Sequence, residues 1–261
     1  MTGASSGIGR ELAKQFADNG YDLLIAAEDD GLQAAAGELR TAGADVDAVQ
    51  VDLATAQGVE RLYAAVGDRP VDALALNAGI GAGGRFAGPD GDRTSLRDEL
   101  EIIDLNVRST VHLTKRVMSD MVARDHGRVL FTSSIASTMP GSFEAVYAAS
   151  KSFVQSFALA LRNELKDTGV TVTSLMPGPV ETEFFARGDM LDTKVGAGEK
   201  DDPADVARDG FKALMAGDER VVSHSASTKA QARATRLLPD STKAALHRKM
   251  SEPGSARHDD S

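Results

Sequence analysis

The sequence of 261 residues contains no cysteine, which excludes disulfide bonds, thiolate nucleophiles and zinc sites built on cysteine. It has only five histidines, and these are scattered along the chain instead of standing at the spacing that metal ligands need. We therefore expect a reaction that uses no metal ion.

Basic residues are outnumbered, because 29 lysines and arginines stand against 39 acidic residues and give a formal net charge of −10. No basic stripe interrupts the acidic excess, so nucleic acid and anionic membranes are not expected as partners. The chain also lacks an apolar run of about 18 residues and the pattern of a secretory signal at its start. We expect a cytoplasmic protein that acts on a small molecule.

Strand-like apolar runs alternate with helix-like segments, a pattern typical of an α/β protein with a doubly wound parallel sheet. A 42% share of hydrophobic residues in a chain of this length is enough for one core, so we expect one domain, residues 1–251. Residues 252–261 are polar and are expected to form a disordered tail.

The pattern also predicts where the individual elements lie, although residues 81–92 and 184–201 fit neither type. The expected strands are 22–27, 46–51, 72–76, 128–132, 170–176 and 220–222. The expected helices are 8–19, 31–42, 56–67, 96–124, 147–167, 203–216 and 227–249.

A tyrosine and a lysine carry the strongest chemical signal. Tyr147 and Lys151 stand four residues apart in a segment with a helical pattern, so both side chains lie on one face of the helix. A phenol with a pKa near ~10 is a poor base at neutral pH, and a cation beside it stabilises the phenolate. Ser134, thirteen residues before Tyr147, follows an apolar run that indicates a buried strand. We therefore expect these three side chains to converge.

The chain opens with a glycine-rich turn, residues 2–9, that runs into a helical pattern. Backbone N–H groups and the helix dipole favour an anion at such a helix N-terminus. The turn therefore predicts a site for a phosphate or a pyrophosphate.

Together these motifs resemble the single-domain branch of the short-chain dehydrogenase/reductase family, with its TGxxxGIG and YxxSK patterns. The resemblance covers almost the whole chain, as far as residue 207. It implies a Rossmann-type sheet, a nicotinamide dinucleotide as cofactor, and hydride transfer between that cofactor and a carbonyl or secondary alcohol. The matching positions are Thr2-Gly3-Ala4-Ser5-Ser6-Gly7-Ile8-Gly9, Asp52, Asn77-Ala78-Gly79, Asn106, Ser133-Ser134, Tyr147 with Lys151, and Pro177-Gly178-Pro179-Val180-Glu181-Thr182.

The resemblance implies a catalytic tetrad of Asn106, Ser134, Tyr147 and Lys151. Tyr147 would exchange a proton with the substrate oxygen, which Ser134 would orient through a hydrogen bond. Lys151 would lower the pKa of the phenol and hold the nicotinamide ribose. Asn106 would bend its helix and anchor a water molecule. Ser133 competes with Ser134 for its role, and the offset of 13 residues to Tyr147 favours Ser134.

The same resemblance implies the cofactor contacts. Glu28 and Asp29 end the second strand of the family pattern, and acidic groups there accept from ribose hydroxyls and repel a 2′-phosphate. We therefore expect NAD(H) in preference to NADP(H), while Arg10 and Arg40 leave NADP(H) open. The implied contacts are Gly3, Ser5, Gly7, Ile8, Gly9, Glu28, Asp52, Leu53, Asn77, Ala78, Gly79, Tyr147, Lys151, Pro177, Gly178, Val180 and Thr182.

One expected element is missing, because only Met1 precedes the glycine turn where the family has a buried central strand. About five buried aliphatic side chains are worth roughly 8–15 kcal/mol, which is comparable with the ~5–15 kcal/mol by which whole domains are stable. We expect the sheet to lack most of its first strand and the recorded start to be wrong or truncated. The alternative is a degenerate remnant without catalytic activity.

The substrate pocket is expected between residues 135–143 and a flap at 184–201. Met and Phe side chains in both segments suit a hydrophobic ketone or secondary alcohol. Three functions stay open, namely an active oxidoreductase, a dinucleotide-binding pseudoenzyme, and an isomerase or dehydratase that uses a transient oxidation. Helices 96–124 and 147–167 are expected to assemble a homodimer or homotetramer.

Overall fold

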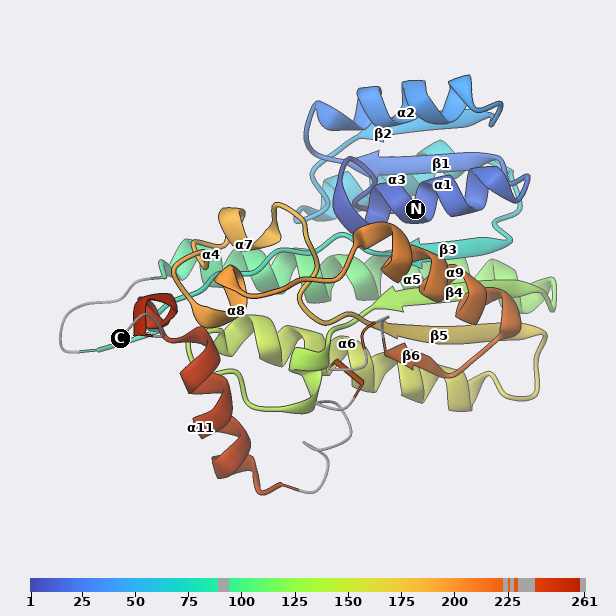
Figure 1. The fold of residues 1–261 in the computed structure, drawn as a ribbon. Helices are drawn as coiled ribbons and strands as arrows, with labels where there is room; N and C mark the ends of the chain where they lie inside the picture. The colour runs from blue at the N-terminus through green and yellow to red at the C-terminus, as the bar shows by residue number, and fades with distance from the viewer. Residues whose placement is uncertain (89–93, 223–224, 226–227, 230–237, 259–261) are drawn as a thin grey trace.

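Parallel strands alternate with helices in the computed structural model, which describes residues 1–88, 94–222, 225, 228–229 and 238–258 (Figure 1). The strands pair in two parallel groups, β1 with β2, and β3-β4-β5-β6 in that order. Each predicted strand lies within one residue of its expected bounds. The strands are β1 (Leu23–Ala27), β2 (Val46–Gln50), β3 (Ala73–Leu76), β4 (Gly127–Thr132), β5 (Val170–Met176) and β6 (Arg220–Val222).

Helices cover both faces of the strands, as Figure 1 shows. Buried side chains of α1, α2 and α9 form one apolar cluster with Ile25, and those of α3, α5 and α6 form a second cluster with Ala26. Neighbouring residues of β1 thus face opposite layers, and the predicted doubly wound α/β fold is confirmed. These helices are α1 (Gly7–Asp18), α2 (Gly31–Thr41), α3 (Ala56–Val66), α5 (Thr110–Ala123), α6 (Ala145–Glu164) and α9 (Pro203–Ala216).

Within the described residues, the place between β1 and β3 holds only part of a strand, as predicted. Strands β1 and β3 do not pair with each other, and residues 1–4 lie between them. Thr2 forms an isolated parallel bridge with Ala26 and donates its N–H to the Ala75 carbonyl at 3.0 Å. The Thr2 hydroxyl also accepts the N–H groups of Asn77 and Ala78, both at 3.0 Å. This short stretch holds the glycine turn between the two groups of strands.

The expected helix 96–124 is continuous but changes its winding. It begins as α4 (Leu96–Ile102), passes through the π-helical segment η1 (Ile103–Ser109) and continues as α5. The segment 184–201, which fitted no pattern, contains two short helices, α7 (Phe184–Arg187) and α8 (Lys194–Ala197). Of the other unassigned segment, residues 89–92 lie outside the described residues.

The end of the chain differs from the predictions. The expected helix 227–249 is wrong in its bounds, since α11 spans Asp240–Ser251 and residues 230–237 lie outside the described residues. Pro239 precedes α11 with an extended ψ of 148°, and a proline has no N–H to continue a helix from the preceding turn.

The predicted disordered tail is also wrong at its start. A 3₁₀ turn, η4 (Ser255–His258), follows α11. The N–H of Gly254 donates to the Asp192 carboxylate at 3.0 Å, and the Ser255 hydroxyl accepts the N–H of Lys194 at 3.0 Å. Polar contacts with the α8 region thus order residues that composition alone marks as a tail, while residues 259–261 lie outside the described residues.

None of the helices within the described residues is both long enough and apolar enough to cross a membrane. Within the same ranges, His, Asp and Glu side chains form no group of three that could hold a metal ion.

Candidate active site

A cavity of about 560 Å³ lies at the carboxyl ends of the parallel strands. Its wall includes the glycine turn, the ends of β1, β3 and β4, one face of α6, the segment after β5, and part of α11. Most of the predicted site residues meet in this cavity. Those that line it are Gly3, Ser5, Gly7, Ile8, Glu28, Leu53, Asn77, Ala78, Gly79, Ser134, Tyr147, Lys151, Pro177, Gly178, Val180 and Thr182.

Three predicted site residues do not line the cavity, namely Gly9, Asp52 and Asn106. The Asp52 carboxylate accepts the N–H of Ala54 at 2.8 Å and so supports the turn that leads into α3. A Cβ atom on Gly9 would lie 1.9 Å from the Gly3 carbonyl oxygen, so Gly9 allows the turn to pack on α1. Asp52 and Gly9 therefore support the local fold and do not form the cavity wall.

The glycine turn offers room and charge for a pyrophosphate. Gly7 begins α1 with a φ of +53°, and a Cβ atom there would lie 2.9 Å from the Thr182 methyl group across the cavity. The first residues of this 12-residue helix, Gly7 and Ile8, line the cavity, and the first N–H groups of a helix have no partner within it. A dinucleotide fits, because the turn can hold its phosphates while the same cavity extends to Lys151. When bound, such a cofactor supplies or accepts the hydride.

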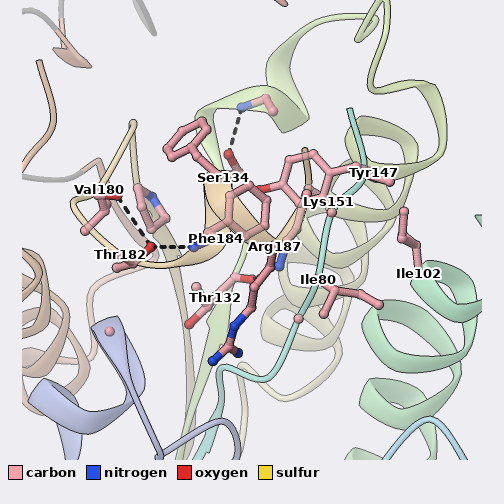
Figure 2. A pocket seen from close by; sticks show the side chains of 18 of the residues that line it. Ile80, Ile102, Thr132, Ser134, Tyr147, Lys151, Val180, Thr182, Phe184 and Arg187 are labelled. Atoms are coloured by element: carbon pink, nitrogen blue, oxygen red, sulfur yellow. Dashed lines mark hydrogen bonds between the residues drawn. The ribbon is translucent and has the colours of Figure 1, made fainter. Parts of the chain in front are cut away.

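Ser134, Tyr147 and Lys151 face one cavity from two elements (Figure 2). Ser134 follows β4, while Tyr147 and Lys151 lie one turn apart on α6. The Lys151 ammonium lies 5.9 Å from the centre of the Tyr147 ring and donates to the Thr132 carbonyl at 3.0 Å. The Ser133 hydroxyl donates to the Lys151 carbonyl at 3.1 Å. The hydroxyl beside Tyr147 is therefore that of Ser134, whose oxygen also accepts the N–H of Ala136 at 3.1 Å.

Asn106 holds the loop after β3 in place. It lies within η1 and is only 1% exposed. Its side-chain amide donates to the Ile80 carbonyl at 2.9 Å and to the Ser150 hydroxyl at 3.0 Å, and its oxygen accepts the Ile80 N–H at 3.0 Å. Asn106 lies where the helix winds as a π-helix, while the bend that it was expected to cause stays a prediction. The predicted water contact of Asn106 stays a prediction.

Burial sets the protonation of the reactive pair. It raises the pKa of the Tyr147 phenol, the hydrogen bond with Ser134 opposes this shift, and the nearby Glu144 adds to it. Burial also lowers the pKa of the Lys151 ammonium to about 8. The groups that shift the pKa of the phenol here are Ser134 and Glu144 together with burial, so the expected lowering of that pKa by Lys151 stays a prediction.

Acidic groups surround the end of β1. Burial raises the pKa of Glu28, with smaller contributions from neighbouring carboxylates such as Asp52 and Asp29, while Arg187 of α7 opposes the rise. Arg10 pairs with Glu38, and Arg40 donates to the Val46 carbonyl, so neither reaches the cavity. The cation that does line the cavity beside this acidic group is Arg187, which Figure 2 shows reaching in from the flap, residues 184–201.

Sequence reasoning missed several polar residues of the cavity wall, among them Glu144, Arg187, His247 and Ser251. Arg187 could have been found as one of the three basic residues of the expected flap, with Lys194 and Lys200. Glu144 stands three residues before Tyr147, but its burial depends on α11, and nothing in the sequence indicates that this distant helix returns to the cavity.

Comparisons with known proteins agree with the fold. Residues 1–189 match the family model of short chain dehydrogenases. A relative from Salmonella typhi, the NADP-dependent 3-hydroxy acid dehydrogenase YdfG, is 34% identical over 203 residues, which are 75% of this chain and 78% of the relative.

Two solved structures are similar over most of their length. A short-chain dehydrogenase from Sphingobium yanoikuyae in complex with NADPH has a TM-score of 0.79 at 26% identity and covers 90% of this chain and 91% of its own. A short chain dehydrogenase/reductase from Burkholderia phymatum in complex with NAD has a TM-score of 0.81 at 25% identity, over 89% and 90% of the two chains. The chain therefore belongs to the short-chain dehydrogenase/reductase family and is an NAD(P)-dependent oxidoreductase.

Proposed function

We propose that this protein transfers hydride between NAD(H) and a secondary alcohol or its ketone, with Tyr147 as the acid and base. The observation that carries the proposal is the common cavity of Ser134, Tyr147, Lys151 and the glycine turn. A hydroxyl that orients the substrate oxygen and a phenol that exchanges its proton are what carbonyl reduction and alcohol oxidation require.

The protonation of Tyr147 is the state that carbonyl reduction requires. A buried phenol with a raised pKa holds its proton at neutral pH and can donate it to the oxygen of a ketone. Ser134 can stabilise the same oxygen by donating a hydrogen bond as negative charge develops there. Lys151 can then stabilise the phenolate that Tyr147 becomes.

The preference for NAD(H) is supported by the acidic groups at the end of β1. Glu28 lines the cavity, and Asp29 accepts from the Ser5 hydroxyl at 2.8 Å. A 2′-phosphate placed there would meet Glu28 and Asp29, whereas ribose hydroxyls could donate to them. The names of the relative and of the two solved structures mention NADP, NADPH and NAD, so they favour neither cofactor. The preference for NAD(H) rests on the residues of this chain.

The substrate region supports a compound with an apolar part. Met139, Phe184 and Phe185 line the cavity, and the ring of Phe184 lies 5.2 Å from that of Tyr147. These side chains give an apolar wall on which a hydrocarbon group can pack while the reacting oxygen faces Ser134 and Tyr147.

The test of this proposal is nicotinamide absorbance with both cofactors against a panel of ketones and secondary alcohols. Turnover should occur, and Tyr147→Phe should lower it by about 10²–10⁴-fold while the affinity for the dinucleotide stays. Equal activity of Tyr147→Phe would contradict the role of the phenol. Product formation without a net change in absorbance would instead indicate the isomerase or dehydratase alternative, and binding without any turnover would indicate the pseudoenzyme.

An exposed apolar face supports a homodimer or homotetramer through the long helices. Leu100, Ile103 and Phe153 are 50%, 41% and 40% exposed on α4, η1 and α6, which are the elements expected to assemble. Size-exclusion chromatography with light scattering tests this, and a charged substitution at Phe153 should favour monomers. The cytoplasmic location stays a prediction, which fractionation of the source cells would check.

A further inference from the structure

The segment that leads into α6 packs against α11 and places polar side chains in the cavity wall. The Ser142 hydroxyl donates to the Ala244 carbonyl at 3.1 Å, and His247 Nδ1 lies 3.0 Å from the Ser142 carbonyl oxygen. Ser251 donates its hydroxyl to Glu144 at 2.6 Å. His247 and Ser251 lie one turn apart on the same face of α11. Both of them line the cavity together with Glu144.

Glu144 is a buried carboxylate without a cationic partner among the described residues. It is 7% exposed, and the side-chain hydrogen bond it accepts comes from the neutral hydroxyl of Ser251. Burying a carboxylate is costly unless an opposite charge or several donors compensate it. One hydroxyl leaves most of its acceptor positions unfilled. A positively charged group of a ligand in the cavity would supply the missing partner.

His247 adds a second acceptor to this part of the wall. A carbonyl oxygen only accepts, so the contact with Ser142 requires a proton on Nδ1 of His247. In a neutral imidazole the other ring nitrogen, Nε2, is then an acceptor. His247 is 7% exposed and lines the cavity, so a ligand there can approach its ring.

The acceptors lie close to the reacting groups. Glu144 immediately precedes α6, three residues before Tyr147, and its charge contributes to the raised pKa of the phenol. The wall nearby is apolar, with Met139 and Phe184. A ligand that places its oxygen at Tyr147 can thus reach Glu144 with a group a few bonds away.

We propose that Glu144 and His247 form a subsite for a protonated amino group of the substrate, so that the protein acts on amino ketones or amino alcohols. This inference rests on the proposed function. The ammonium donates to the Glu144 carboxylate and to His247 Nε2 while the carbonyl or hydroxyl oxygen faces Ser134 and Tyr147. Neither residue of the subsite takes part in the hydride or proton transfer.

The test uses pairs of secondary alcohols of matched shape, in which one member carries an ammonium group and the other a methyl group in its place. We expect kcat/KM of the protein to favour the ammonium member by about tenfold or more, because a desolvated charge pair is formed. Glu144→Gln keeps an acceptor for Ser251 and removes the charge, so this ratio should fall about tenfold or more. An unchanged ratio, or a wild-type preference for the methyl member, would overturn the proposal.

Two variants separate charge recognition from a structural role. Glu164→Gln makes the same change at an exposed position at the end of α6, and the ratio should stay at the wild-type value. Ser251→Ala breaks the contact between α11 and Glu144 but keeps the charge, so the preference for ammonium should persist. If Ser251→Ala lowers the ratio as much as Glu144→Gln, the effect comes from helix position and the proposal is wrong.

If the protein turns over no alcohol or ketone, the proposed function is refuted, but the subsite is not. A binding measurement then tests the subsite. Titration calorimetry with the Tyr147→Phe protein and NAD⁺ should give a lower Kd for the ammonium member than for the methyl member. Glu144→Gln in the same background should remove this difference. Equal Kd values for both members before that substitution would refute the subsite.

Discussion

The ammonium of Lys151 lies 5.9 Å from the centre of the Tyr147 ring and donates a hydrogen bond of 3.0 Å to the Thr132 carbonyl. The two side chains thus share one wall of the cavity, but the nearest acceptor of the ammonium belongs to β4. Lys151 can act on Tyr147 through its charge, and this charge depends on pH because burial lowers the pKa of the ammonium to about 8.

This dependence predicts the pH profile of carbonyl reduction. Below pH 8 Lys151 is protonated and can stabilise the phenolate that forms when Tyr147 donates its proton. Above about pH 8 the ammonium loses its proton, so kcat/KM should fall by up to about tenfold per pH unit. Initial rates across the pH range measure this, and Lys151→Arg should remove the decline because a guanidinium stays charged. A wild-type profile that stays flat above pH 8 would contradict the assignment.

The two adjacent serines should differ in their effects. Ser134→Ala removes the hydroxyl beside Tyr147 and should lower kcat/KM by about 10²–10³-fold, the usual cost of losing a donor to the reacting oxygen. Ser133→Ala removes the bond to the Lys151 carbonyl and should chiefly lower the free energy of unfolding, by about 1 kcal/mol. Steady-state kinetics and chemical denaturation of both variants distinguish the roles. A larger kinetic loss in Ser133→Ala would reverse the assignment.

Cofactor choice should depend on Glu28. Glu28→Arg replaces a repelling charge with one that can pair with a 2′-phosphate, so the ratio of kcat/KM for NADPH to that for NADH should rise by about tenfold or more. Asp18→Asn changes the net charge at an exposed position at the end of α1 and serves as the control. A wild-type protein that already prefers NADPH would show that the acidic groups at β1 do not decide the choice.

Gly9 should tolerate no side chain. A Cβ atom there would overlap the Gly3 carbonyl oxygen at 1.9 Å, so Gly9→Ala should destabilise the fold by about 1–3 kcal/mol or more. Gly37 provides the matched control, because it lies in α2 with no atom near its missing Cβ. Gly37→Ala should stabilise the protein by about 0.5–1 kcal/mol. Denaturation midpoints in urea measure both effects.

Sequence patterns predicted the strands because each apolar run is short and bounded by turn residues, and these features are local. The helix expected at 227–249 failed because the pattern was extended across Pro239, which cannot continue a helix. The tail was expected to be disordered because composition does not show that Asp192 and Lys194 lie beside residues 254–256.

The candidate site was predictable where motifs are local, as in the glycine turn and the pair of Tyr147 and Lys151. The pKa shifts of Tyr147 and Lys151 could not be predicted, since they depend on burial by segments far away in the sequence. Glu144 illustrates the same limit. Its place in the sequence is typical of an exposed helix start, and only the return of α11 turns it into a buried acceptor in the cavity wall.

The pairing of Thr2 with both β1 and β3 has a consequence for motion. Because neighbouring residues of a strand direct their N–H groups to opposite sides, the amides of Leu24 and Ala73 point toward the space between the two groups of strands. Deuterium uptake at these amides should be faster than at Leu130 in the middle of β4. A dinucleotide that touches both the glycine turn and Lys151 bridges the two groups, so its addition should slow uptake at this seam.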